Sequence, residues 1–147
     1  FGRLIGLPKV IGMKDSTGDI DSLQRFLSQG SDLVIFEGED SVVLPAIQAG
    51  ASGGIGATYN VMPQLFVKVW RAFQAQDIET AESAQLRIID IIDALTVVDL
   101  FAGLKQTLAW MGLECGVPRT PNRSLTNEET TRLRDSLNAA GFFDNEQ

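Results

Sequence analysis

Three short apolar runs, each followed by a helical pattern, constrain the fold of this chain more than any other feature. The runs cover residues 9–14, 33–36 and 53–58. The second run is continuously apolar, as expected of a parallel strand that is buried on both faces. Because strands that alternate with helices at short spacing are typical of parallel sheets, the first half of the chain predicts an α/β fold.

Start and stop signals mark the helices between these runs. Asp19 is expected to cap the first helix, which ends at Gly30. Asp40 or Ser41 is expected to cap the second helix. Pro63 suits the first turn of the third helix.

The second half of the chain predicts helices only. Thr126 with Glu129 three residues later predicts a capping box at the start of a final helix. We therefore expect residues 1–75 to hold the βα units and residues 76–147 to form a C-terminal helical region. In that region one apolar stripe lies near helical spacing: Ile78, Ala81, Leu86, Ile89, Ile92 and Leu95.

The small number of predicted strands is informative. Three parallel strands leave exposed edges and make a poor sheet by themselves, whereas a complete (β/α)8 barrel takes about 250 residues. The chain is therefore expected to be either a small doubly wound domain or the C-terminal part of a TIM barrel, with about three βα units, a helical extension and no N-terminal half. The start at Phe1, which is not a methionine, favours a piece of a longer protein.

The composition excludes several classes of function. The net charge of -7 argues against nucleic-acid binding, which depends on neutralising phosphates. The absence of histidine removes the commonest general base and metal ligand, so we expect no metal site. No apolar run is long enough to span a membrane, and a single cysteine without a secretory signal fits the reducing cytoplasm.

Polar or glycine residues end each predicted strand, in segments 14–19, 37–41 and 53–60. The carboxyl ends of parallel strands form the binding edge of α/β folds, so the three segments are expected to face one pocket. The glycines of the third segment could hold a phosphate, or they could let a substrate or a helix come close. Tyr59 is expected to pack and hold its loop.

Lys14 is the sharpest candidate at that edge. If its apolar neighbours exclude water, desolvation lowers the pKa of the amine and leaves the neutral nucleophile that attacks a ketone. The alternative is a lysine that reaches solvent or pairs with Asp15 or Asp40. Asp40 could likewise be only a helix cap, or it could recognise substrate hydroxyls.

Three segments resemble one enzyme family. Residues 12–19 (GMKDSTGD) are similar to the Schiff-base lysine motif of the N-acetylneuraminate lyase and dihydrodipicolinate synthase family. Residues 50–63 resemble that family's strand-eight segment. Residues 101–105 and 116–121 resemble its C-terminal helical region, so the likeness covers nearly the whole chain.

The resemblance implies a pyruvate-dependent aldolase-type lyase on a (β/α)8 barrel. Lys14 would form an imine with pyruvate or another 2-keto acid, and neither a metal nor a diffusible cofactor would be needed. Ser16 would lie near the substrate, Gly38 and Asp40 would line its distal end, and the carbonyl of Ile55 would point toward the lysine. The family also implies a homo-oligomer, commonly a tetramer.

Two positions depart from the sialic acid lyases of this family. Ser41 stands where they carry glutamate, and Ala57 stands where they carry serine. Each change removes a hydrogen-bond partner for a polyhydroxy tail, so a shorter 2-keto-3-deoxy sugar acid or a synthase-type condensation is at least as well supported as sialic acid cleavage.

The family's tyrosine proton shuttle and its hydroxyl pair for the pyruvate carboxylate belong to earlier strands. Neither segment matches this sequence, whose similarity begins just before strand six. The alternative to an enzyme is therefore a non-catalytic chain, either a truncated fragment that is inactive without the N-terminal strands or an assembly module.

Overall fold

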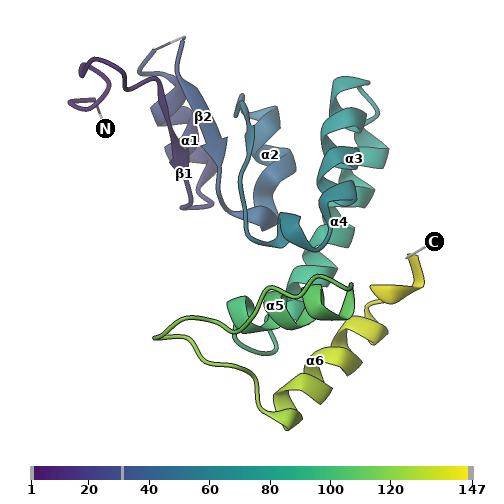
Figure 1. Cartoon of the computed structure of the whole chain (residues 1–147). Coiled ribbons are helices and arrows are strands. Elements are labelled where there is room, and N and C mark those ends of the chain that lie inside the picture. Colours follow the sequence, from purple (N-terminus) through teal and green to yellow (C-terminus); the bar gives the residue numbers. More distant parts are fainter. Residues whose placement is uncertain (1, 31, 146–147) are drawn as a thin grey trace.

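The computed structural model describes residues 2–30 and 32–145 as a parallel α/β unit joined to a group of helices (Figure 1). The strands are β1 (Gly12–Asp15), β2 (Val34–Glu37) and β3 (Gly53–Gly54). The α-helices within these ranges are α1 (Ile20–Leu27), α2 (Val43–Gln48), α3 (Pro63–Gln74), α4 (Ile78–Leu95), α5 (Leu100–Trp110) and α6 (Asn127–Ala139). The 3₁₀ turns are η1 (Asp40–Val42), η2 (Thr58–Asn60) and η3 (Phe143–Asn145).

The sheet is parallel with the order β1-β2-β3, which confirms the predicted strand type. In this register Lys14 lies beside Phe36, and Phe36 lies beside Gly53. Helices α1 and α2 cover one face, where Leu23 and Ala46 pack on Ile35. Because side chains alternate along a strand, Lys14 and Phe36 lie on the opposite face.

β1 and β3 are shorter than the sequence indicated, whereas β2 has the expected length and begins one residue later. β1 begins three residues later than the apolar run and ends at Asp15, so Lys14 is its penultimate residue. The third run pairs only at Gly53 and Gly54, after which the backbone turns into η2. Helix α1 ends at Leu27 rather than at Gly30.

Several of the predicted helix starts are confirmed. Asp19 caps α1 by accepting a hydrogen bond from the backbone amide of Asp21, and Pro63 opens α3. Thr126 and Glu129 form the predicted capping box at α6. One signal was wrong, because Asp40 is the first residue of η1 and Glu39 provides the cap.

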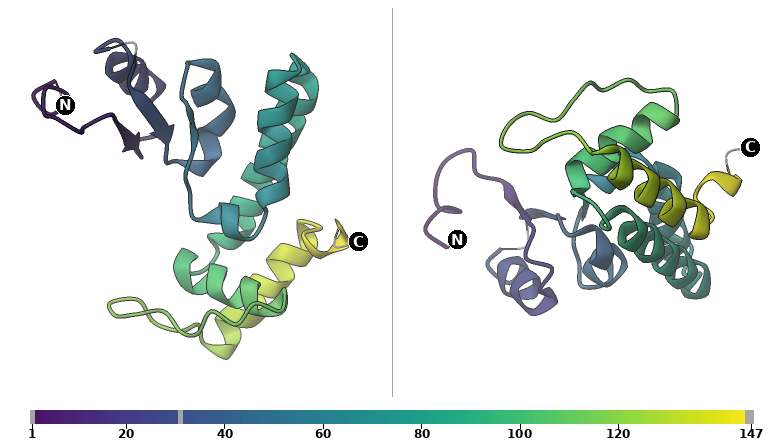
Figure 2. Two further views of the ribbon diagram at one scale, coloured as in Figure 1. Left: turned by 45° about the horizontal axis from the view of Figure 1, so that its top comes forward. Right: turned by 90° about the horizontal axis from the view of Figure 1, so that it is seen from below.

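A second core joins α2, α3 and the helices that follow. Helices α5 and α6 lie beyond the carboxyl ends of the strands (Figures 1 and 2). The predicted stripe on α4 is partly wrong, because Leu86 is 63% exposed. The core crosses the expected boundary at residue 75, and its α4 members are Ala81, Ala84, Ile88, Ile91, Ala94 and Leu95.

Within the described ranges, no helix is both long and apolar enough to cross a membrane.

Candidate functional site

Lys14 lies on the face of the sheet that α1 and α2 leave uncovered. Its side chain is exposed, whereas the next residue, Asp15, is buried. The expectation that neighbours exclude water around Lys14 is therefore wrong for the described chain. The physical reason is that both helices that flank these strands pack on the other face, with Ile35 and Met13.

Gly38 allows Lys14 to lie across the end of β2. A Cβ atom at Gly38 would collide with Cε of Lys14 and with Oγ of Ser16. The amide of Gly38 donates to the carbonyl of Asp15 at 2.6 Å, which fixes the two strand ends together. Three of the predicted site residues, Lys14, Ser16 and Gly38, are thus in one place.

Asp40 ties the loop after β2 to the loop after β3. Its Oδ2 accepts from the Thr58 amide at 2.9 Å and from the Thr58 hydroxyl at 2.6 Å. Asp40 is only 8% exposed, and its Oδ1 has no hydrogen-bond partner among the described residues. A Cβ at Gly56 would collide with that oxygen, so glycine makes room for the carboxylate. Asp40 therefore bonds a partner 18 residues away rather than its own helix.

Two carboxyl groups lie beneath Lys14, and the sequence did not single them out as a pair. Asp15 and Glu37 are register partners, and each is 2% exposed. Oε1 of Glu37 accepts from the amides of Gly38 and Glu39, at 2.8 and 2.7 Å. Burial raises the pKa of the Glu37 carboxyl, opposed by these two hydrogen bonds and reinforced by the nearby Asp15. The only signal in the sequence was the acidic residue at the end of each strand.

Ile55 and Tyr59 complete the glycine segment. The amide of Ile55 donates to the Glu37 carbonyl at 2.8 Å, and its side chain is 49% exposed. Tyr59 stacks on Phe66 with ring centroids 3.5 Å apart, which confirms that it packs. A Cβ at Gly54 would collide with the Tyr59 hydroxyl, so the glycines admit side chains of this chain itself. Burial raises the pKa of Tyr59 above its ordinary value.

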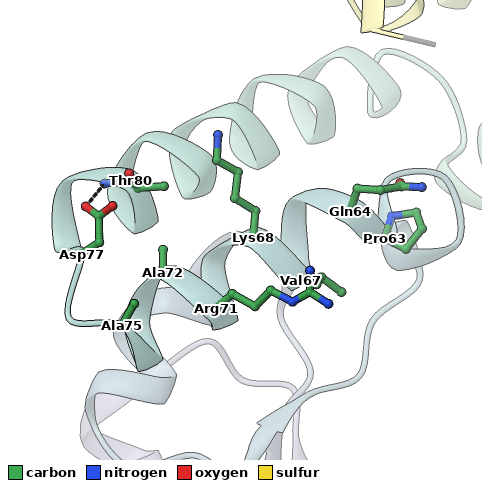
Figure 3. Close-up of a pocket in the computed structure, with 9 residues that line it drawn as sticks. All are labelled: Pro63, Gln64, Val67, Lys68, Arg71, Ala72, Ala75, Asp77 and Thr80. Carbon is green, nitrogen blue, oxygen red and sulfur yellow. Dashed lines mark hydrogen bonds between the residues drawn. The ribbon is translucent and has the colours of Figure 1, made fainter. Parts of the chain in front are cut away.

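Two hollows on the surface lie away from Lys14. One, of about 640 Å³, lies between α3 and the start of α4, where Lys68 and Arg71 line it (Figure 3). Asp77 caps α4 beside that hollow by accepting from the Thr80 amide. The other, of about 310 Å³, follows the open edge of β3 and is lined by Gly53, Phe66 and Trp70 among others. Within the described ranges, no group of three acidic or cysteine side chains could hold a metal ion.

Comparison with known proteins gives a consistent family. The model of the dihydrodipicolinate synthetase family matches residues 1–140. An N-acetylneuraminate lyase of Escherichia coli O1:K1 is 35% identical over 111 residues, which are 76% of this chain and 37% of the lyase.

Solved structures give the same picture. A dihydrodipicolinate synthase from Bacillus anthracis matches with a TM-score of 0.86 and 25% identity, over 93% of this chain and 47% of that one. A catalytic lysine mutant of the Ruminococcus gnavus sialic acid aldolase matches with a TM-score of 0.87 and 27% identity, over 95% and 47%. This chain thus spans about half the length of the structures that it matches, or less.

Proposed function

Because this chain belongs to the dihydrodipicolinate synthetase family, we propose that it carries the catalytic lysine of a pyruvate-dependent carbon–carbon lyase. The observation that carries the proposal is that the side chains of Lys14 and Ser16 both lie against Gly38, at the carboxyl ends of β1 and β2. Parallel α/β folds place their reactive groups at this edge. The Ruminococcus gnavus neighbour, which is described as a catalytic lysine mutant, supports the choice of a lysine.

In the proposed reaction, Nζ of Lys14 attacks the keto carbon of a 2-keto acid. The addition product loses water, and the keto carbon and Nζ become joined as an imine. A base takes the proton of the substrate hydroxyl on C4, the bond between C3 and C4 breaks, and the protonated imine accepts its electron pair, which releases an aldehyde and leaves an enamine of pyruvate. Protonation of the enamine and addition of water then release pyruvate and restore the amine. No metal or diffusible cofactor takes part.

Asp40 and Ser16 are proposed to contact the substrate on either side of the lysine. The buried Oδ1 of Asp40 has no donor among the described residues, so a substrate hydroxyl could supply one. Gly38 and the Ile55 carbonyl are proposed to line the site beside them. The proton of the Ser41 hydroxyl is already used, because it donates to Oε1 of Glu39 at 2.8 Å. Because Ala57 also lacks a hydroxyl, a 2-keto-3-deoxy sugar acid or a synthase-type condensation is proposed as at least as suitable a reaction as sialic acid cleavage.

Because Lys14 is exposed in this chain, the working enzyme needs a further element that covers it. A lysine nucleophile needs a neutral amine, and exclusion of water is one way to obtain it. We propose that β1, β2 and β3 are the last three strands of a (β/α)8 barrel whose earlier strands cover Lys14. Those strands would bring the proton shuttle and the carboxylate clamp that the family resemblance implies. The complete protein is proposed to act in the cytoplasm as a homo-oligomer, with a tetramer as the family expectation.

Borohydride trapping with pyruvate tests the proposal. The natural gene product that contains this chain should gain one reduced pyruvyl group at Lys14, located by peptide mass analysis. Lys14→Arg should abolish the gain, while Lys68→Arg, at an exposed site on α3, should keep it. The proposal fails if the unsubstituted protein gains no pyruvyl mass.

The second candidate is a non-catalytic assembly module. It is favoured by the unpaired outer edges of β1 and β3 in the described sheet and by the apolar hollow beside β3. This reading predicts that the 147-residue chain self-associates or binds barrel strands, and it predicts no trapping. A monomer that unfolds cooperatively in sedimentation and denaturation experiments would contradict it.

A further inference from the structure

Gln85 is a buried amide on the apolar face of α4. It is 6% exposed and has Ala81, Ala84 and Ile88 as buried neighbours on the same helix. Both ends of its amide are used. Oε1 accepts from the Leu44 amide at 2.8 Å, and Nε2 donates to the Ser41 carbonyl at 3.0 Å.

These two bonds support a helix start that has no cap of its own. The first amides of a helix lack partners within it, and the N-cap position of α2, Val42, gives no side-chain hydrogen bond. Gln85 supplies that bond from an element 41 residues further along the chain. The turn η1 and the start of α2 are therefore held by α4.

The same turn carries Asp40, which is adjacent to Ser41. Asp40 in turn holds the amide and hydroxyl of Thr58 in the loop after β3. The hydrogen bonds of Gln85 and those of Asp40 are thus joined by the peptide bond between Asp40 and Ser41, which links α4 through η1 to η2. Lys14 and Ser16 lie outside it, since Gly38 and the β1–β2 ladder fix them.

We infer that Gln85 is a positioning residue that sets the distal end of the substrate site through Asp40, an inference that rests on the proposed function. Loss of its amide leaves the Leu44 amide and the Ser41 carbonyl without partners in a buried place. The turn must then move toward water, and Asp40 moves with it. The lysine end of the site stays in place.

Three variants of the natural gene product test the inference. Gln85→Leu removes both hydrogen bonds at similar size. Gln85→Glu keeps the acceptor for Leu44, but it can donate to Ser41 only when protonated. Gln74→Leu, at an exposed position of α3, is the matched control.

Activity should separate the two ends of the site. The rate of imine trapping with pyruvate should be the same in all variants. KM for cleavage of 2-keto-3-deoxygluconate should rise roughly ten- to a hundredfold in Gln85→Leu. In Gln85→Glu, KM should rise at neutral pH and recover toward acid pH, where the carboxyl group regains a proton. An unchanged KM in Gln85→Leu, with or without a lower melting temperature, overturns the inference.

Amide hydrogen exchange gives a second readout that needs no catalysis. The Thr58 amide, bound to Asp40, should exchange about tenfold faster or more in Gln85→Leu than in Gln74→Leu, because its acceptor is displaced. Equal exchange in the two variants overturns the inference. Absence of an imine in the unsubstituted protein refutes the proposed function instead, and the exchange of Thr58 then decides only whether Gln85 positions Asp40.

Discussion

Replacing Thr58 with valine removes the hydroxyl group that bonds Asp40 and so joins the loops after β2 and β3. Thr58 is 2% exposed, and its Oγ1 lies 2.6 Å from Oδ2 of Asp40. Hydrogen bonds to charged groups contribute about 1.5–3 kcal/mol each. Because valine fills a similar volume and the Thr58 amide keeps its own bond to Asp40, we expect Thr58→Val to lower the free energy of unfolding by about 2 kcal/mol.

Thr107 offers a matched control for the same substitution. It is fully buried at 0% exposed, and its Oγ1 donates to the Gly103 carbonyl at 2.9 Å. That acceptor is neutral and lies inside α5, where the helical backbone also uses it. We expect Thr107→Val to cost less than about 1 kcal/mol.

Urea unfolding of both variants, with Asp40→Asn and the double variant, measures the difference. The cycle between Asp40 and Thr58 should give a coupling energy of about 1 kcal/mol or more, since the two residues share hydrogen bonds. Equal costs at Thr58 and Thr107 would refute the reasoning, as would a coupling below about 0.5 kcal/mol. Either result would mean that the contact contributes no more than ordinary packing.

Three further predictions concern single groups. Burial raises the pKa of Tyr59, the chain's single tyrosine, so its absorbance should change only with alkaline unfolding; ionisation near pH 10 in the folded chain would contradict this. Burial also raises the pKa of Glu37 above 4.5, so the folded chain holds that proton more tightly, and the stabilisation present below pH 4.5 is lost as the pH rises. In Glu37→Gln, the free energy of unfolding measured with denaturant should decline less as the pH is raised from 4.5. An equal decline with pH in the variant and in the unsubstituted chain would contradict the prediction. Thr126→Ala should cost about 1 kcal/mol by removing the cap of α6, whereas Thr131→Ala in the same helix should cost under about 0.5 kcal/mol.

The sequence predicted best those features that depend on residues close together in the chain. The caps at Asp19 and Thr126 and the opening proline of α3 each act within one helical turn, so a short window holds the whole signal. The parallel sheet followed from the same kind of evidence, because β-rich runs and helices alternate.

Features that depend on distant partners could not be predicted in this way. Asp40 looks like a helix cap in sequence, and its true partner, Thr58, becomes apparent only when two strand ends meet. Gln85 lies in a helical window where nothing distinguishes it from an exposed glutamine. Leu86 shows the converse case, because an apolar residue near the right spacing falls outside the face that the neighbouring helices bury.

The two ends of the candidate site therefore differ in what holds them. Asp40, Thr58 and Gln85 are all buried and bonded to one another or to neighbouring backbone, so the distal end is built by contacts within this chain. Lys14 is exposed, and the face on which it lies is the one that α1 and α2 leave open. The Schiff-base role proposed for Lys14 requires surroundings that favour the neutral amine, so in that role the lysine end would depend on cover that α1 and α2 do not give. Substrate selectivity and lysine reactivity should accordingly respond to different substitutions, the first within η1, η2 and α4, and the second at whatever covers the open face of the sheet.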